Sequence, residues 1–285
     1  MFFRLDKGVI ADARQQDKLS RVLWYNKEIQ WFFITKNKKM KMYTRASYLL
    51  LFCVLAFVSV ACGADSQTHT TTLRPTPTAT QAVTAQRILT TPITYVALGA
   101  SDAVGVGSNE PGAQGYVPLL AAHLQKGSHL LNLGVSGIRL HEALMQELPL
   151  ALNTSPTLIT IWLVANDFVG GVSYDRYMKD LDSLLQQLRT GTKARIVMAN
   201  LPDLTRLPAF ASQSATQKAK TVAAIQRWNA TITTIAAHYA VTLVDLFSHQ
   251  SQLTTHPEYI SGDGFHPSPA GYVQLSNYFW DAIKA

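Results

Sequence analysis

The chain has 285 residues, and 47% of them are hydrophobic, which is enough for one large domain or two small ones. Its net charge of +7 lies in residues 1–62, with eleven Lys/Arg against four Asp/Glu, whereas residues 63–285 carry fourteen of each and have no net basic field for nucleic acid. Both cysteines, Cys53 and Cys62, also lie near the N-terminus, which excludes disulfides, cysteine-based metal sites and thiol nucleophiles from residues 63–285.

The first 39 residues mix aromatic with basic side chains and contain no clear signal for the start or end of a helix. One interpretation is an amphipathic segment at a membrane surface. The other is an upstream stretch that is absent from the mature protein because translation begins at Met40 or Met42. We favour the second interpretation, because the next residues along the chain are typical of an export signal.

Residues 40–62 have the arrangement of an export signal. A basic stretch precedes the almost continuously apolar residues 47–61, a run shorter than the ~20 residues of a membrane-spanning helix. Positive charge before such a run favours export of the downstream part of the chain. The run ends in Val58-Ser-Val-Ala-Cys62, which resembles a bacterial lipoprotein signal, although Ser59 stands where Leu is usual. We expect lipidation of Cys62, with simple cleavage nearby or an uncleaved anchor as alternatives.

Residues 63–92 are rich in Thr, Ala, Pro and Gln and predict a disordered tether. From Ile93 onward, apolar runs of strand length alternate with helical patterns, and Ser214 is a candidate N-cap. We predict strands at 93–98, 129–133, 158–163, 194–199 and 241–246, and helices at 116–125, 138–152, 174–189, 214–239 and 269–283. This alternation predicts an α/β fold for residues 93–285, with a five-stranded parallel sheet and helices on both faces.

Residues that could take part in catalysis come after several of the predicted strands. Ser101 follows the first strand, Gly134 the second and Asn166 the third, while Asp263 and His266 come after the fifth. Each of these segments alone is also typical of an ordinary turn. Because parallel strands end at the same edge of a sheet, we expect the segments to meet there and to form one site.

These residues suit nucleophilic hydrolysis. The Ser101 hydroxyl needs a base, which His266 can supply, and Asp263 can hold the imidazole in the required tautomer. The oxyanion needs donors, and the candidates are the N–H groups of Ser101 and Gly134 and the amide of Asn166. The missing side chain of Gly134 should let a substrate oxygen approach its N–H. No metal or organic cofactor is required, and six further histidines lack metal-ligand spacing: His123, His129, His141, His238, His249 and His256.

The four blocks resemble those of the SGNH hydrolases, also called the GDSL esterase/lipase family. The four residues for which that family is named fall on Ser101, Gly134, Asn166 and His266, and the Asp-x-x-His-Pro ending is also present. The resemblance covers about residues 93–285. It implies a three-layer, flavodoxin-like α/β/α fold, and an esterase that forms an acyl-enzyme and acts on lipid esters, short-chain esters, thioesters or acetylated sugars.

The chain departs from the family pattern at two blocks. The first block reads Gly-Ala-Ser-Asp instead of Gly-Asp-Ser-Leu, so that a carboxylate is missing at Ala100 and present at Asp102. Val164 stands where the third block usually has Gly. We expect altered hydrogen bonding and a reshaped pocket, without loss of catalysis. The Gly-x-Ser-x-Gly motif of the other hydrolase fold is absent, because Ile138 stands where its last Gly belongs after Ser136.

The sequence therefore predicts a monomeric serine esterase that is secreted or anchored to the outer face of a cell membrane. Its expected substrates are lipid, short-chain or O-acetyl-glycan esters, and nucleic acid is not an expected partner. Two alternatives stay open, namely a non-catalytic surface-binding module and an acyltransferase in which a wall polymer replaces water. Asn200 and Phe265 are candidates for the pocket wall, and Trp162 is expected in the core.

Overall fold

The computed structural model describes residues 86–88 and 90–285. The predictions for residues 1–39 and 40–62, including lipidation of Cys62, lie outside this range. Within it, none of the helices combines the length and the apolar character that crossing a membrane requires. Residues 86–88 are helical and the Ile88 side chain is fully buried, so the packed part of the chain begins before the predicted boundary at residue 93.

Five parallel strands form one sheet in the order β2-β1-β3-β4-β5, which confirms the predicted α/β fold. The strands are β1 (Thr94–Gly99), β2 (His129–Asn132), β3 (Leu158–Trp162), β4 (Arg195–Ala199) and β5 (Thr242–Val244). In the centre of the sheet, Val96 is in register with Leu131 on one side and Ile159 on the other. Strand β3 is buried throughout, as expected for a strand covered on both faces.

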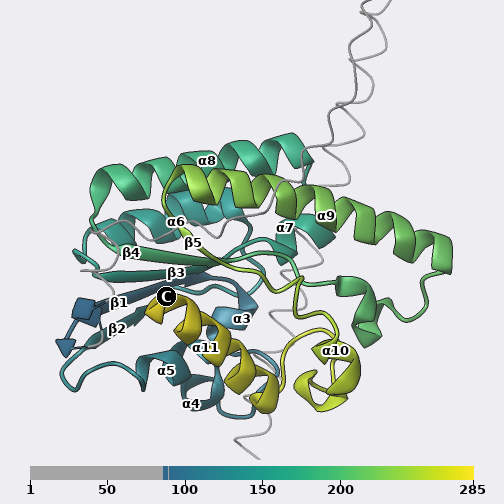
Figure 1. Ribbon diagram of the computed structural model, residues 1–285, viewed down its shortest axis with the longest axis horizontal. Coiled ribbons are helices and arrows are strands. Elements are labelled where there is room, and N and C mark those ends of the chain that lie inside the picture. The colour runs from purple at the N-terminus through teal and green to yellow at the C-terminus, as the bar shows by residue number, and fades with distance from the viewer. Residues whose placement is uncertain (1–85, 89) are drawn as a thin grey trace, which may run out of the picture. The chain divides into compact units, whose positions relative to one another are not determined.

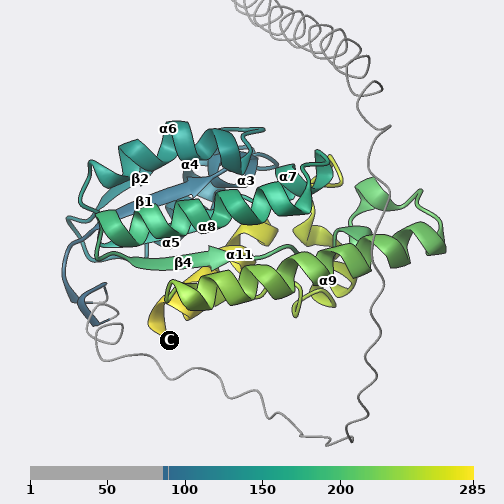
Figure 2. The same ribbon diagram turned by 90° about the horizontal axis from the view of Figure 1, so that it is seen from above.

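Helices cover both faces of the sheet and give a three-layer arrangement (Figures 1 and 2). One face carries α6 (Leu140–Leu152), α8 (Tyr174–Gly191) and α9 (Ala215–His238). The other face carries α4 (Pro111–Gln114), α5 (Tyr116–Ala121) and α11 (Pro269–Lys284). Shorter helices are α3 (Ser101–Val104), α7 (Ala165–Val169) and α10 (Gln252–Thr255), and 3₁₀ turns occur at Leu204–Arg206, Pro208–Phe210 and Pro257–Tyr259.

The long helices form where the sequence predicts them. Along α8 the buried leucines recur at helical spacing, so that one apolar stripe faces the core: Leu181, Leu184, Leu185 and Leu188. Ser214 caps α9 in a reciprocal arrangement, because its hydroxyl accepts from Gln217 N–H and the Gln217 amide oxygen accepts from Ser214 N–H. This confirms the expected N-cap.

A buried carboxyl group on α6 holds the end of β1. The Glu147 side chain is 2% exposed, and its Oε2 accepts a hydrogen bond of 3.1 Å from Gly99 N–H. Its Oε1 is buried without a hydrogen-bond partner among the described residues. Burial raises the pKa of Glu147 to about 8, against the lowering effect of the Gly99 N–H. At neutral pH this side chain is therefore an uncharged acid that anchors the strand two residues before Ser101.

The Glu147 carboxyl should make stability depend on pH. Its folded-state pKa of about 8 lies above the ordinary 4.5, so the native state binds the proton more tightly. The free energy of unfolding should therefore fall as pH rises from about 4.5 to about 8. Glu147→Gln keeps an uncharged acceptor for Gly99 and should remove this decline, which makes it more stable than the wild type at pH 9 by roughly 2–4 kcal/mol.

Urea unfolding at pH 5, 7 and 9 measures this difference. Glu110→Gln, at an exposed position, serves as the control and should follow the wild type at every pH. Parallel stability curves for the wild type and Glu147→Gln would show that the buried carboxyl does not titrate as described.

Candidate active site

The candidate nucleophile lies at a tightly packed turn from β1 into α3. Ser101 is the first residue of α3 and is 7% exposed. A Cβ atom at Gly99 would lie 2.6 Å from Ala103 Cβ, closer than side chains can approach. The turn therefore requires the small residues that the sequence places before Ser101.

Three side chains form a continuous hydrogen-bonded line at the carboxyl edge of the sheet. His266 Nε2 lies 2.9 Å from Ser101 Oγ, and His266 Nδ1 lies 2.6 Å from Asp263 Oδ2. Asp263 and His266 belong to the loop that precedes α11, so the fold brings His266 to Ser101 across 165 positions of the chain. The arrangement has the geometry of a nucleophile, a base and an orienting acid.

The loop around Asp263 fixes that carboxylate in place. Its Oδ1 accepts from Ser261 Oγ at 2.8 Å, from Phe265 N–H at 2.8 Å and from His266 N–H at 2.9 Å. Burial opposes ionisation of Asp263, but these hydrogen bonds and the one to His266 outweigh it and hold its pKa well below the usual range. Asp263 therefore stays anionic at any pH near neutrality and can stabilise a protonated His266. Nothing in the sequence identifies Ser261 as a hydrogen-bond donor to Asp263, except that it lies two residues earlier in the chain.

Asn166 and Asp167 link the third block to the loop before α6. Asn166 Nδ2 donates to the Ile138 carbonyl at 2.9 Å, and because an amide carries two N–H groups, one is left for a ligand. Asp167 is 2% exposed, and its Oδ2 accepts from Leu140 N–H at 2.9 Å. Burial raises the pKa of Asp167 to about 6. These two bonds fix the position of the Asn166 amide relative to the Gly134 loop.

Packing gives a reason for glycine at position 134 besides the predicted access of a substrate oxygen to its N–H. A Cβ atom there would lie 2.7 Å from Ala103 Cβ and 3.2 Å from the Ala100 carbonyl, so glycine is needed to pack the second block against the nucleophile turn. Its N–H donates to Asn132 Oδ1 at 3.1 Å, and Asn132 Nδ2 donates to the Ala103 carbonyl at 2.6 Å. A substrate oxygen would have to share or replace the Asn132 contact. Asn132, two residues before Gly134, was not predicted from the sequence.

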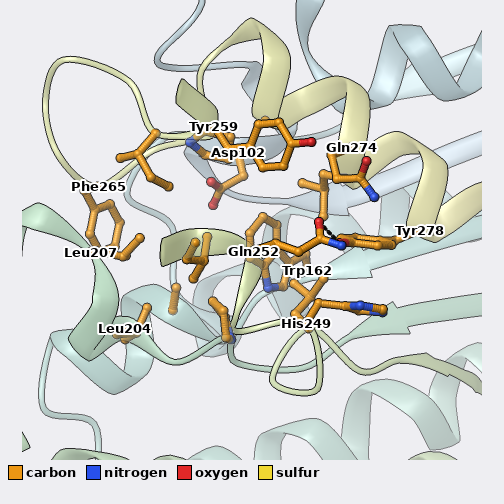
Figure 3. Close-up of a pocket in the computed structure, with 18 residues that line it drawn as sticks. Asp102, Trp162, Leu204, Leu207, His249, Gln252, Tyr259, Phe265, Gln274 and Tyr278 are labelled. Atoms are coloured by element: carbon orange, nitrogen blue, oxygen red, sulfur yellow. Dashed lines mark hydrogen bonds between the residues drawn. The ribbon is translucent and has the colours of Figure 1, made fainter. Parts of the chain in front are cut away.

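An apolar cavity of about 100 Å³ lies beside the nucleophile turn (Figure 3). Phe265 lines it, as proposed from the sequence, and its ring is perpendicular to that of His266 with centroids 5.1 Å apart. Trp162 is 8% exposed and is both a core residue and part of the cavity wall. Asp102, 8% exposed, is the one carboxyl group among the lining residues, which are mostly apolar but include the polar side chains His249, Gln252 and Gln274.

Asn200 has a structural role instead of the pocket-lining role proposed from the sequence. Its side chain is 2% exposed and bridges the ends of two strands. Asn200 Nδ2 donates to Asp245 Oδ1 at 2.8 Å, and its Oδ1 accepts from Leu246 N–H at 2.8 Å. Among the described residues, no group of three or more His, Cys, Asp and Glu side chains is placed to hold a metal ion.

The packing at Gly134 can be tested by adding one methyl group. Gly134→Ala places a Cβ 2.7 Å from Ala103 Cβ, so we expect a loss of about 1–3 kcal/mol in the free energy of unfolding. Gly112→Ala is the matched control, because nothing lies within 4 Å of its added Cβ. Urea unfolding of both variants measures the difference, and equal stability would mean that the Gly134 contact is easily relaxed.

Comparison with known proteins agrees with this geometry. Residues 97–274, more than half of the chain, match the GDSL-like Lipase/Acylhydrolase family. No curated protein matches significantly. Similar solved structures include TesA (23% identity, 67% of this chain and 98% of that chain covered, TM-score 0.54) and LAE5, an alpha/beta hydrolase enzyme from the metagenome of Lake Arreo, Spain (20%, 69% and 97%, 0.56).

A third structure with the same fold is Axe2, an acetylxylan esterase from Geobacillus stearothermophilus, with 19% identity over 70% of this chain and 97% of that one and a TM-score of 0.56. At such identities the structural likeness shows the fold alone. The family match covers the end of β1, the Ser101 turn, and the loop that carries Asp263 and His266. The chain therefore belongs to the GDSL-like lipase/acylhydrolase, or SGNH, family.

Proposed function

We propose that the protein hydrolyses carboxylic esters through an acyl-enzyme formed on Ser101. The observation that carries the proposal is the line of contacts Ser101–His266–Asp263, with distances of 2.9 and 2.6 Å. A serine oxygen within hydrogen-bond distance of an imidazole that is oriented by a carboxylate is the arrangement that activates a hydroxyl as a nucleophile. Membership of the GDSL-like lipase/acylhydrolase family supports the same reaction.

In the first half of the reaction, Ser101 Oγ bonds to the ester carbonyl carbon while its proton passes to His266 Nε2. Asp263 stabilises the resulting imidazolium. The oxyanion would accept hydrogen bonds from Ser101 N–H and the Asn166 amide, with Gly134 N–H as a third donor if the Asn132 oxygen gives way. Collapse of the tetrahedral intermediate breaks the ester C–O bond, and the leaving alcohol takes the proton from His266.

In the second half, water attacks the acyl group on Ser101 and gives a proton to His266. The intermediate then releases the carboxylic acid, and Ser101 Oγ recovers its proton. An acyltransferase would differ only in the acceptor that replaces water. A non-catalytic binding module would have no need for the 2.9 Å alignment between Ser101 and His266, so the contact favours catalysis.

Lipid, short-chain and O-acetyl-glycan esters are the substrate classes we propose. Acetylated xylan is included because acetylxylan esterases are among the proteins that share the fold. Export and anchoring through lipidated Cys62 remain part of the proposal on the strength of the sequence pattern in residues 40–62. That location would place the enzyme near both lipid and wall polymers.

The nucleophile can be tested with p-nitrophenyl esters and two serine variants of the full chain. Ser101→Ala should lose at least ~10³-fold in kcat/KM, because the oxygen that forms the acyl-enzyme is gone. Ser136→Ala removes an exposed serine from the loop between β2 and α6 and should keep wild-type turnover. Equal activity of Ser101→Ala and the wild type would contradict the proposal.

Asn166 can be tested as an oxyanion donor. Asn166→Ala should lower kcat by about 10²–10³-fold with little change in KM, because the amide would act only on charge that develops in the transition state. Asn153→Ala, at an exposed position after α6, is the control and should leave kcat unchanged. Thermal melts of both variants separate lost donation from lost folding, and unchanged kinetics in folded Asn166→Ala would remove Asn166 from the mechanism.

A further inference from the structure

The apolar cavity borders a second, smaller hollow that Asn166 helps to line. A small hollow lined by Asn166, Ala100 and Val164 shares three lining residues with the larger cavity. These shared residues are Asp102, Trp162 and Ala165, and they form the boundary between the two spaces. Because Asp102 directly follows Ser101 and belongs to both linings, an acyl group on Ser101 that enters the cavity would pass the Asp102 side chain.

The cavity is suited to an aliphatic chain. Its volume of about 100 Å³ compares with roughly 10–15 Å³ needed to hold one water molecule. Beyond Asp102, its walls are largely apolar, with contributions from Leu204, Leu207 and Leu275. An alkyl chain would gain free energy by leaving water for such a site, whereas an acetyl group has much less apolar surface to bury.

Asp102 supplies the only carboxyl group among the described residues that line the cavity. Figure 3 shows its carboxylate pointing into the cavity. An ionised carboxylate in apolar surroundings keeps water around it, and stripping that water costs far more than displacing it from an uncharged acid.

The groups around Asp102 allow it to titrate near neutrality. Burial raises the pKa of Asp102 to about 6, with His266 opposing the rise and Asp263 adding to it. Tyr116 on α5 and Tyr272 on α11 also face this carboxyl, but burial raises the pKa of both phenols far above neutrality, so they stay uncharged.

We propose that the cavity is the acyl-chain subsite of the enzyme and that Asp102 controls entry to it. The uncharged Asp102 acid admits a medium-length alkyl chain, whereas the ionised carboxylate holds water at the entrance and limits the enzyme to short acyl groups. Acid conditions thus widen the substrate range. This inference rests on the proposed esterase function; among the lipid esters proposed above it specifies medium-chain acyl esters and a condition for their use.

The test is the ratio of kcat/KM for p-nitrophenyl octanoate to that for p-nitrophenyl acetate, measured with the full chain from pH 5 to pH 7.5. Because both substrates depend on the same catalytic groups, the effect of titrating those groups cancels in the ratio. For the wild type it should be higher at pH 5, by up to about 30-fold if only the uncharged acid admits the chain. Asp102→Asn should give a high ratio that does not change with pH, and Asp102→Leu should do the same.

Asp281→Asn is the matched control, because this exposed carboxylate on α11 pairs with Lys284 and should leave the wild-type profile intact. A wild-type ratio that does not vary with pH, or an Asp102→Asn ratio that still does, would overturn the proposal. Binding of uncharged 1-octanol to Ser101→Ala, measured by calorimetry, gives a readout that needs no turnover. Tighter binding at pH 5 than at pH 7.5 supports the entrance role even if no ester is hydrolysed, whereas equal binding refutes it.

Discussion

The close packing at the carboxyl end of β1 is the constraint on which the site depends. Ala103 allows neither Gly99 nor Gly134 a side chain, so the first and second blocks of the motif are pressed against the same methyl group. Glu147 holds Gly99 N–H from α6 on one face of the sheet. The nucleophile is therefore fixed by contacts from several distant segments, which provides the preorganisation that nucleophilic catalysis requires.

Much of the fold follows from local patterns in the sequence. The buried strands read as short apolar runs, and α8 shows its apolar stripe at helical spacing, so their positions could be predicted within a few residues. The ends of the strands are less predictable where a backbone N–H bonds to a side chain instead of to a neighbouring strand. Strand β5 ends at Val244 instead of Leu246, because Leu246 N–H donates to the Asn200 side chain.

Some parts of the site could likewise be predicted from the sequence and others could not. Ser101, Asp263 and His266 come together as expected, because the order of strands and polar loops already predicts a common edge. The roles of Asn132, Glu147 and the apolar cavity could not be predicted, since they depend on side-chain contacts between separate segments. Gly134 is an example. The sequence indicates that a glycine at this position belongs to the site, but it does not show that a side chain there would collide with Ala103.

The most direct test of the central claim is to trap the nucleophile. The full chain would be treated with an alkyl fluorophosphonate, digested and examined by mass spectrometry for the modified peptide, with His266→Ala as a second sample. We predict one phosphonate per chain on Ser101 in the wild type, with labelling slowed strongly when His266 is absent, because the imidazole removes the proton from the attacking oxygen. Labelling of Ser136 or no labelling at all would contradict the role of Ser101 as an activated nucleophile.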